Sequence, residues 1–319
     1  MNTFSSEKQS QLIDELKQIS TESQNQDTLD IDLLDAKGIL EKINVEDQKV
    51  AEVVNGIIPQ IAKAVDEIVK AFANGGRLVY IGAGTSGRLG ILDAVECPPT
   101  FSVSSKQVVG IIAGGNKAIY KAVEGAEDSE SFSIDDLKAA NLSEKDVLVG
   151  IAASGRTPYV ISAMKYGKSI GATVVGVSCS YNEKFNQAND INLCAVVGAE
   201  ALTGSTRMKS GTAQKLILNM LTTASMIRSG KSYKNLMIDV NASNEKLYAR
   251  AVRIVMQATD CDYDCAKQAL DQSENNAKLA TLMILTGLSL EQSRDCLAKN
   301  NGFLRKAVEQ ISLDQMGSN

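Results

Sequence analysis

The sequence predicts an α/β fold in which a doubly wound, five-stranded parallel sheet is flanked by helices and followed by a small helical domain. Five short apolar runs are each followed by small residues, and stretches with helical spacing separate most of them. Such near-continuous apolar strands are typical of parallel sheets that helices cover on both faces. From about Thr259 onward only helical patterns occur.

The elements follow in a regular order along the chain. Polar and apolar residues at helical spacing predict a helix over 7–19 and two more over Ile39–Asn44 and Val50–Asn74. The apolar runs predict strands at Arg77–Ile81, Val108–Ala113, Asp146–Ile151, Thr173–Ser178 and Ile191–Val197. A long, largely apolar helix is expected over Arg207–Ile227, where its surface is either core or a subunit interface.

The last part of the chain contains several short helical segments and predicts a compact three-helix unit of the ubiquitin-associated type. The alternative is that these helices extend the main domain. The side chains expected to be buried are Val255, Ala266, Leu270, Leu279, Leu282, Leu285 and Leu304. We therefore expect an N-terminal helical arm over 1–50, a sheet domain over 51–250, a helical domain over 251–312 and a tail over 313–319.

Composition limits the classes of function. The net charge is −5 with both signs interspersed, which argues against nucleic acid or an anionic membrane as a partner. The sequence has no apolar run long enough to span a bilayer and no signal-peptide pattern, and its cysteines are scattered, so we expect a cytoplasmic protein. Histidine is absent, so acid–base chemistry must come from Glu, Asp, Lys, Tyr or Cys.

The first candidate ligand-binding loop runs from Gly82 to Gly87 and matches G-x-G-x-x-G between a strand and a helix. Alone, this pattern is weak evidence for a dinucleotide site, and the second strand lacks the acidic residue that such a site requires. Gly84, Thr85 and Ser86 instead offer backbone amides and hydroxyls at a helix N-terminus, which suit a phosphate or sugar oxygens.

Two further loops carry hydroxyls and cations at the starts of helices. One follows the third strand and the other precedes the long helix. Ligands of parallel α/β sheets bind at the carboxyl ends of the strands, so a shared phosphorylated ligand is expected there. Ordinary helix caps are the alternative for each loop. The candidate binding residues of these loops are Ser154, Gly155, Arg156, Thr157, Ser205, Thr206 and Lys209.

The loops G-x-G-T-S and A-S-G-x-T resemble the SIS (sugar isomerase) domain of phosphosugar-binding proteins. Longer strings are similar to the N-acetylmuramic acid 6-phosphate etherase family: IGAGTSGRLGILDAVECPPTF, AVEGAED, GIAASGRTPYV and ALTGSTRMKSGTAQK. The similarity covers nearly the whole chain. Val95 stands where the family pattern has serine, and TESQNQ replaces a more basic N-terminal stretch.

The resemblance implies a lyase that cleaves the D-lactyl ether of N-acetylmuramic acid 6-phosphate by elimination and then hydration. It implies Glu96 as the general acid, Glu127 as the base at C2, and a homodimer in which the partner subunit completes the site. That chemistry needs no metal and no cofactor, and it belongs to amino-sugar metabolism and cell wall recycling. Two alternatives remain on the same fold: a non-catalytic phosphosugar-binding regulator similar to glucokinase regulatory protein, and a phosphosugar isomerase.

Overall fold

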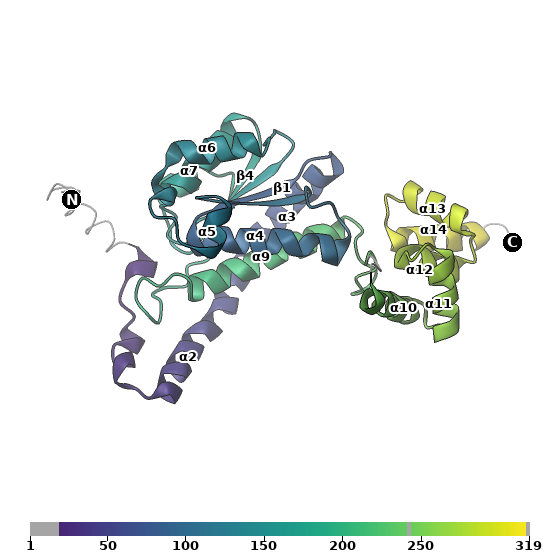
Figure 1. Ribbon diagram of the computed structural model, residues 1–319, viewed down its shortest axis with the longest axis horizontal. Coiled ribbons are helices and arrows are strands. Elements are labelled where there is room, and N and C mark those ends of the chain that lie inside the picture. Colours follow the sequence, from purple (N-terminus) through teal and green to yellow (C-terminus); the bar gives the residue numbers. More distant parts are fainter. Residues whose placement is uncertain (1–18, 241–243, 317–319) are drawn as a thin grey trace. The chain divides into compact units, whose positions relative to one another are not determined.

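The computed structural model describes residues 19–240 and 244–316 and contains the predicted five-stranded parallel sheet, in the order β2-β1-β3-β4-β5 (Figure 1). All pairs of neighbouring strands are parallel. The predicted helix over 7–19 and the end of the predicted tail, 317–319, lie outside the described residues. The strands are β1 (Leu78–Gly82), β2 (Val108–Ile112), β3 (Val147–Ile151), β4 (Thr173–Ser178) and β5 (Ile191–Cys194).

The strand order reverses between β1 and β3, because the chain leaves β1 toward β2 on one side and returns to β3 on the other. In open parallel sheets, ligands bind in the crevice outside the carboxyl ends of the strands at such a reversal. The residues that follow β1 and β3 are therefore the ones the topology offers to a ligand. These are two of the three loops predicted from the sequence.

Helices cover both faces of the sheet, which confirms the doubly wound prediction (Figure 1). On one face, α6 (Glu130–Ala139) and α7 (Pro158–Ser169) share a buried cluster with Val79 and Ile81 of β1. On the other face, the buried Tyr80 of β1 donates a hydrogen bond of 2.9 Å to Asp93 of α4 (Gly84–Phe101). The short helices α5 (Asn116–Tyr120) and α8 (Glu183–Gln187) complete the crossovers.

Glycines in the strands allow two of these helices to approach the sheet closely. A Cβ atom on Gly110 of β2 would lie 2.7 Å from the Cα atom of Ile91 in α4. A Cβ atom on Gly150 of β3 would lie 2.7 Å from Met164 of α7. Both helices begin at a loop at the carboxyl edge of the sheet. The close contacts at Gly110 and Gly150 therefore set the distance of these helices, and of the loops that precede them, from the sheet.

The N-terminal segment consists of three short 3-10 turns, over Ser20–Glu22, Gln26–Thr28 and Ile31–Leu33, followed by α2 (Ala36–Asn55) and α3 (Ile58–Ala73). The two predicted helices exist, but α2 runs through the predicted gap and the break falls at Gly56 instead. Asp35 caps α2 by accepting a hydrogen bond from the Gly38 amide, which explains the earlier start. Proline in the first turn of α3 fixes where that helix begins.

The chain divides into two compact units, Met1–Val95 with Lys106–Thr222, and Glu96–Ser105 with Thr223–Asn319. Helices α4 and α9 (Lys209–Arg228) contribute residues to both. The predicted domain boundaries at 50, 250 and 312 remain predictions. Within the described residues, no helix is both long and apolar enough to cross a membrane.

The second unit has its own helical core, as predicted. The part of it after Thr259 contains four described helices rather than three, because breaks at Ser273, Gly287 and Asn300 divide the pattern. The expected core residues are buried, except that Leu285 is 36% exposed near the end of its helix. The helices of this unit are α10 (Glu245–Thr259), α11 (Tyr263–Gln272), α12 (Ala277–Thr286), α13 (Leu290–Lys299) and α14 (Leu304–Met316).

Candidate active site

The loop between β1 and α4 makes a tight turn. Gly84 has a φ of +53°, in the left-handed region that favours glycine. A Cβ atom on Gly82 would lie 2.8 Å from the Gly87 nitrogen, so the end of the strand and the first turn of the helix touch through their backbones. The Ser86 hydroxyl is buried and donates a 2.9 Å hydrogen bond to Gln214 of α9. Ser86 thus holds α4 to α9, while Gly84 is exposed.

The loop after β3 presents its hydroxyls without using them as helix caps. Thr157 occupies the N-cap position of α7, yet its side chain accepts no capping hydrogen bond. Gly155 has a φ of +68°, which turns the chain between Ser154 and Arg156. The helix N-terminus adds free backbone amides and a positive partial charge, which attract an anion. The Thr157 side chain therefore does not act as a helix cap, which was the alternative to a role in ligand binding.

This second loop lines a cavity of about 270 Å³ together with residues from two other segments. Ser154, Arg156 and Thr157 form one wall. Ile19 and Glu22 come from the N-terminal segment, and Glu127 and Asp128 come from the connection between α5 and α6. The cavity combines a cation, two hydroxyls and a helix N-terminus, which is the set of groups that binds a phosphate.

Glu127 lies in a short 3-10 turn, Ala126–Asp128, which is anchored at its first residue. Gly125 precedes it in the left-handed conformation, and Ala126 is buried against the α6–α7 face of the sheet. The Glu127 side chain is exposed. It lines the cavity formed with Ser154, Arg156 and Thr157, and also a second cavity, described next. It is the only residue that the two described cavities share.

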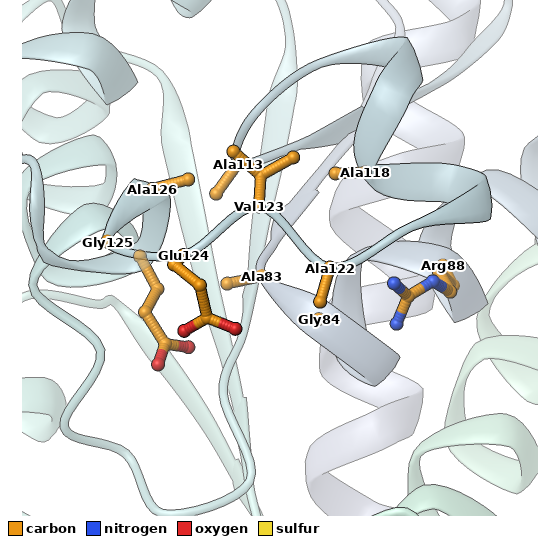
Figure 2. Close-up of a pocket in the computed structure, with 11 residues that line it drawn as sticks. Ala83, Gly84, Arg88, Ala113, Ala118, Ala122, Val123, Glu124, Gly125 and Ala126 are labelled. Carbon is orange, nitrogen blue, oxygen red and sulfur yellow. The ribbon is translucent and has the colours of Figure 1, made fainter.

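The second cavity has a volume of about 180 Å³ and lies at the start of α4 (Figure 2). Its wall is built mostly from small apolar residues, and its charged residues are Arg88, Glu124 and Glu127. Arg88 was not among the residues predicted from the sequence, although its position one turn after Gly84 on α4 could have indicated it. The remaining lining residues are Ala83, Gly84, Ala113, Ala118, Ala122, Val123, Gly125 and Ala126.

Glu96, the other predicted catalytic residue, is exposed on α4, about three helical turns after Gly84. Pro98 and Pro99 follow it within the same helix. Among the described residues that line the two cavities, Glu127 is present and Glu96 is not. The two carboxylates thus differ in setting, because one belongs to a cavity wall and the other to a helix surface.

The third predicted loop forms a buried polar junction at the start of α9. The Glu200 carboxylate accepts hydrogen bonds from the Lys209 amide, at 2.8 Å, and from the Ser210 amide and hydroxyl. The Lys209 ammonium pairs with Glu46 of α2. Burial raises the pKa of Glu46, but hydrogen bonds from Lys209 and Lys49 outweigh it and hold that pKa below its usual range. Ser205 and Thr206 are half-buried and precede Lys209 in the same loop. Ser205, Thr206 and Lys209 do not line either described cavity.

Comparison with known proteins gives three matching family descriptions. The glucokinase regulatory protein N-terminal SIS domain matches residues 60–168, the SIS domain matches 120–224, and the C-terminal lid domain of glucokinase regulatory protein matches 234–281. Together these matches cover the sheet domain and part of the helical unit.

Curated relatives match over nearly the whole chain. N-acetylmuramic acid 6-phosphate etherase of Colwellia psychrerythraea is 72% identical and covers 95% of this chain and 98% of its own length. The protein of the same name from Pseudoalteromonas atlantica is 61% identical, covering 94% of this chain and 97% of its own length. N-acetylmuramic acid 6-phosphate etherase 2 of Vibrio cholerae is 58% identical, again over 94% and 97%.

Proposed function

The chain belongs to the N-acetylmuramic acid 6-phosphate etherase family, and we propose here how its residues perform that reaction. The enzyme is a carbon–oxygen lyase that releases D-lactate from N-acetylmuramic acid 6-phosphate and leaves N-acetylglucosamine 6-phosphate. The observation that carries the mechanism is that Glu127 lines both a cavity suited to phosphate and a second cavity lined by Arg88. The regulator and isomerase alternatives are not favoured by relatives this similar.

Glu127 acts as the base at C2 of the open-chain sugar. The C2 hydrogen lies α to the C1 aldehyde, so a carboxylate can remove it while the electron pair moves onto the carbonyl oxygen. The enolate then expels the lactyl oxygen from C3, and Glu96 donates the proton that this oxygen needs. A double bond between C2 and C3 results. Water adds at C3 with Glu96 as base, and C2 regains a proton.

The loop after β3 holds the 6-phosphate. Ser154, Arg156 and Thr157 line one cavity, and Gly155 allows the backbone to turn around the ligand. Thr157 has a hydroxyl that no helix cap consumes, and the N-terminus of α7 supplies amide donors. Gly84 and Thr85 contact the sugar at the start of α4. For Ser86, Ser205, Thr206 and Lys209 we propose a supporting role, because the partners of Ser86 and Lys209 are other side chains.

The homodimer supplies Glu96 from the partner subunit. Glu96 is exposed on a helix surface and lines neither described cavity, which favours a role in a neighbouring subunit's site. Large apolar side chains of the N-terminal segment and α2 are exposed, which is typical of a surface that a partner covers. They are Leu29, Leu33, Leu40 and Val45. The enzyme acts in the cytoplasm, on the 6-phosphate of N-acetylmuramic acid that derives from the cell wall, without nucleic acid as a partner.

Deuterium exchange separates the two glutamates by role. Glu127→Gln should abolish both lactate release and exchange of the C2 hydrogen with solvent deuterium. Glu96→Gln should block lactate release yet retain C2 exchange, because the enolate still forms and collapses back. General acid–base groups contribute about 10²–10⁴-fold each, so both defects are measurable.

Glu144→Gln is the matched control, since Glu144 is an exposed glutamate of the same domain that lines neither described cavity. It should retain turnover within a few-fold of the parent. The reverse pattern in the two catalytic variants would exchange their roles, and normal turnover in both would remove the mechanism. A parent enzyme that releases no lactate would overturn the etherase function itself.

A further inference from the structure

The small cavity beside α4 has the size and lining of a site for a short branched acid. Its volume of about 180 Å³ equals that of roughly six water molecules in the liquid, which is room for a group the size of lactate. Alanines and Val123 supply a surface that suits a methyl group, and Arg88 supplies the cation.

Arg88 retains donors for a ligand. Its Nε donates a 3.0 Å hydrogen bond to the Ile119 carbonyl, which fixes the guanidinium at the cavity wall. Among the residues that the structure describes, Arg88 forms no ion pair with a carboxylate. A half-buried guanidinium without an acidic partner is suited to bind an incoming carboxylate through two parallel hydrogen bonds.

The two cavities match the two anions of the substrate. Arg156 is the cation of the larger cavity and Arg88 that of the smaller one. The substrate carries a phosphate on C6 and a carboxylate on the lactyl group attached to C3. Glu127 lines both cavities, so a sugar with its phosphate at Arg156 and its lactyl group at Arg88 would bring C2 near that carboxylate.

We propose that Arg88 binds the lactyl carboxylate of the substrate in this cavity, and is therefore the residue that selects a 3-O-lactyl sugar over one without that group. The inference rests on the etherase function proposed above. It assigns a residue and a subsite that the glutamate pair and the phosphate loop leave open.

Glu124 lies in the same cavity and must be reconciled with a bound anion. Figure 2 shows its carboxylate and the Arg88 guanidinium on opposite sides of Gly84 and Ala122. A carboxylate held at Arg88 therefore lies away from Glu124. The arrangement places the substrate anion at one end of the cavity and the Glu124 carboxylate at the other.

The test compares ligands with and without the lactyl group. Arg88→Gln should lower kcat/KM for N-acetylmuramic acid 6-phosphate by about 10- to 100-fold, as expected for a lost charged hydrogen-bonded pair. Inhibition by N-acetylglucosamine 6-phosphate, which lacks the lactyl group, should stay within twofold of the parent. That unchanged inhibition also shows that the variant is folded.

Arg156→Gln is the matched variant, and it should weaken both sugars because both carry the phosphate. The methyl ester of the substrate's lactyl carboxylate gives an independent arm: the parent should discriminate against it, whereas Arg88→Gln should not. Equal loss of both sugars in Arg88→Gln would place Arg88 at the phosphate, and no loss would exclude it from the site. Either result overturns the proposal while lactate release by the parent leaves the etherase function standing.

Discussion

Lys209 at the start of α9 pairs with Glu46 of α2, and each side chain is only 3% exposed. The two residues are 163 positions apart in the sequence, so the pair joins α2 to the first turn of α9. Lys49 makes a second contact with the same carboxylate. Such a buried pair constrains which elements meet, whatever its net contribution to stability.

Lys209→Met should destabilise the enzyme by about 3–5 kcal/mol, because it leaves the buried Glu46 carboxylate without its main partner. The double variant Lys209→Met with Glu46→Leu should recover most of this loss. Chemical denaturation measures both free energies of unfolding. Lys37→Met is the control, since Lys37 forms an exposed pair with Glu41. If Lys209→Met costs no more than Lys37→Met, the pair has no structural role.

The environment of Asp146 allows a prediction of how the free energy of unfolding depends on pH. Its buried carboxylate accepts hydrogen bonds from the Arg77 amide at 2.8 Å, from the Arg77 guanidinium at 2.7 Å and from the Ser143 amide at 3.0 Å. Burial raises the pKa of Asp146, but these bonds outweigh it and hold the pKa below its usual range. A depressed pKa means that the stabilisation is present above the ordinary value of 3.8 and is lost as pH falls through the folded-state pKa.

Asp146→Asn should therefore be less stable than the parent at neutral pH and should lose less stability on acidification below about pH 4. Urea denaturation across this pH range gives the comparison. Asp135→Asn replaces an exposed carboxylate and should follow the parent curve. Parallel curves for Asp146→Asn and the parent would show that Asp146 does not titrate differently in the folded state.

Thr157 and Ser154 should affect binding rather than folding. Replacing both with alanine should raise KM at least tenfold, because the proposed phosphate donors are lost. Thr157→Ala alone should leave the free energy of unfolding nearly unchanged, since its hydroxyl caps nothing. Ser129→Ala should do the opposite: its hydroxyl caps α6, so stability falls by about 1 kcal/mol while KM stays constant. Unchanged substrate affinity in the double variant would contradict the phosphate assignment.

A mixed dimer tests whether Glu96 serves the partner subunit. Co-expressed Glu96→Gln and Glu127→Gln chains with different tags form a heterodimer, in which one site would hold both native glutamates. Purified heterodimer should have about half the parent's activity if the site is shared across a two-fold axis. If both glutamates act within one chain, the heterodimer is as inactive as each homodimer. Light scattering that shows an active monomer would also exclude the shared site.

The strands and the loops after them could be predicted because both signals are local. Each strand is a short apolar run, and each loop is indicated by glycines and hydroxyl side chains just before a predicted helix. The end of β5 at Cys194 rather than Val197 is the exception, because the apolar residues after the strand continue its pattern. The positions of the proposed binding loops, after β1 and β3, follow from the topology once the strands are known.

Contacts between distant residues could not be predicted in this way. Lys209 looks in the sequence like a cation for the ligand, and only Glu46, far away in the chain, shows its actual partner. Lys278 lies in an apolar run and is buried, with its ammonium bonded to Asp239 and to two carbonyl groups, those of Gly230 and Gly302. A charge that is satisfied by residues from three segments has no local sequence signal.

Because Gly110 of β2 has no side chain, α4 can pack close to the sheet at this position. A methyl group there would stand 2.7 Å from the Cα atom of Ile91, so the helix would have to rise by roughly 1 Å to reach ordinary carbon–carbon contact. Arg88 lies one turn before Ile91, and a shift of about 1 Å at a ligand-positioning group can cost around 10²-fold in rate. Substrate preference can therefore drift, over evolution, through sheet positions that no ligand touches. A comparison of relatives confined to cavity-lining residues would attribute such a change to the wrong place.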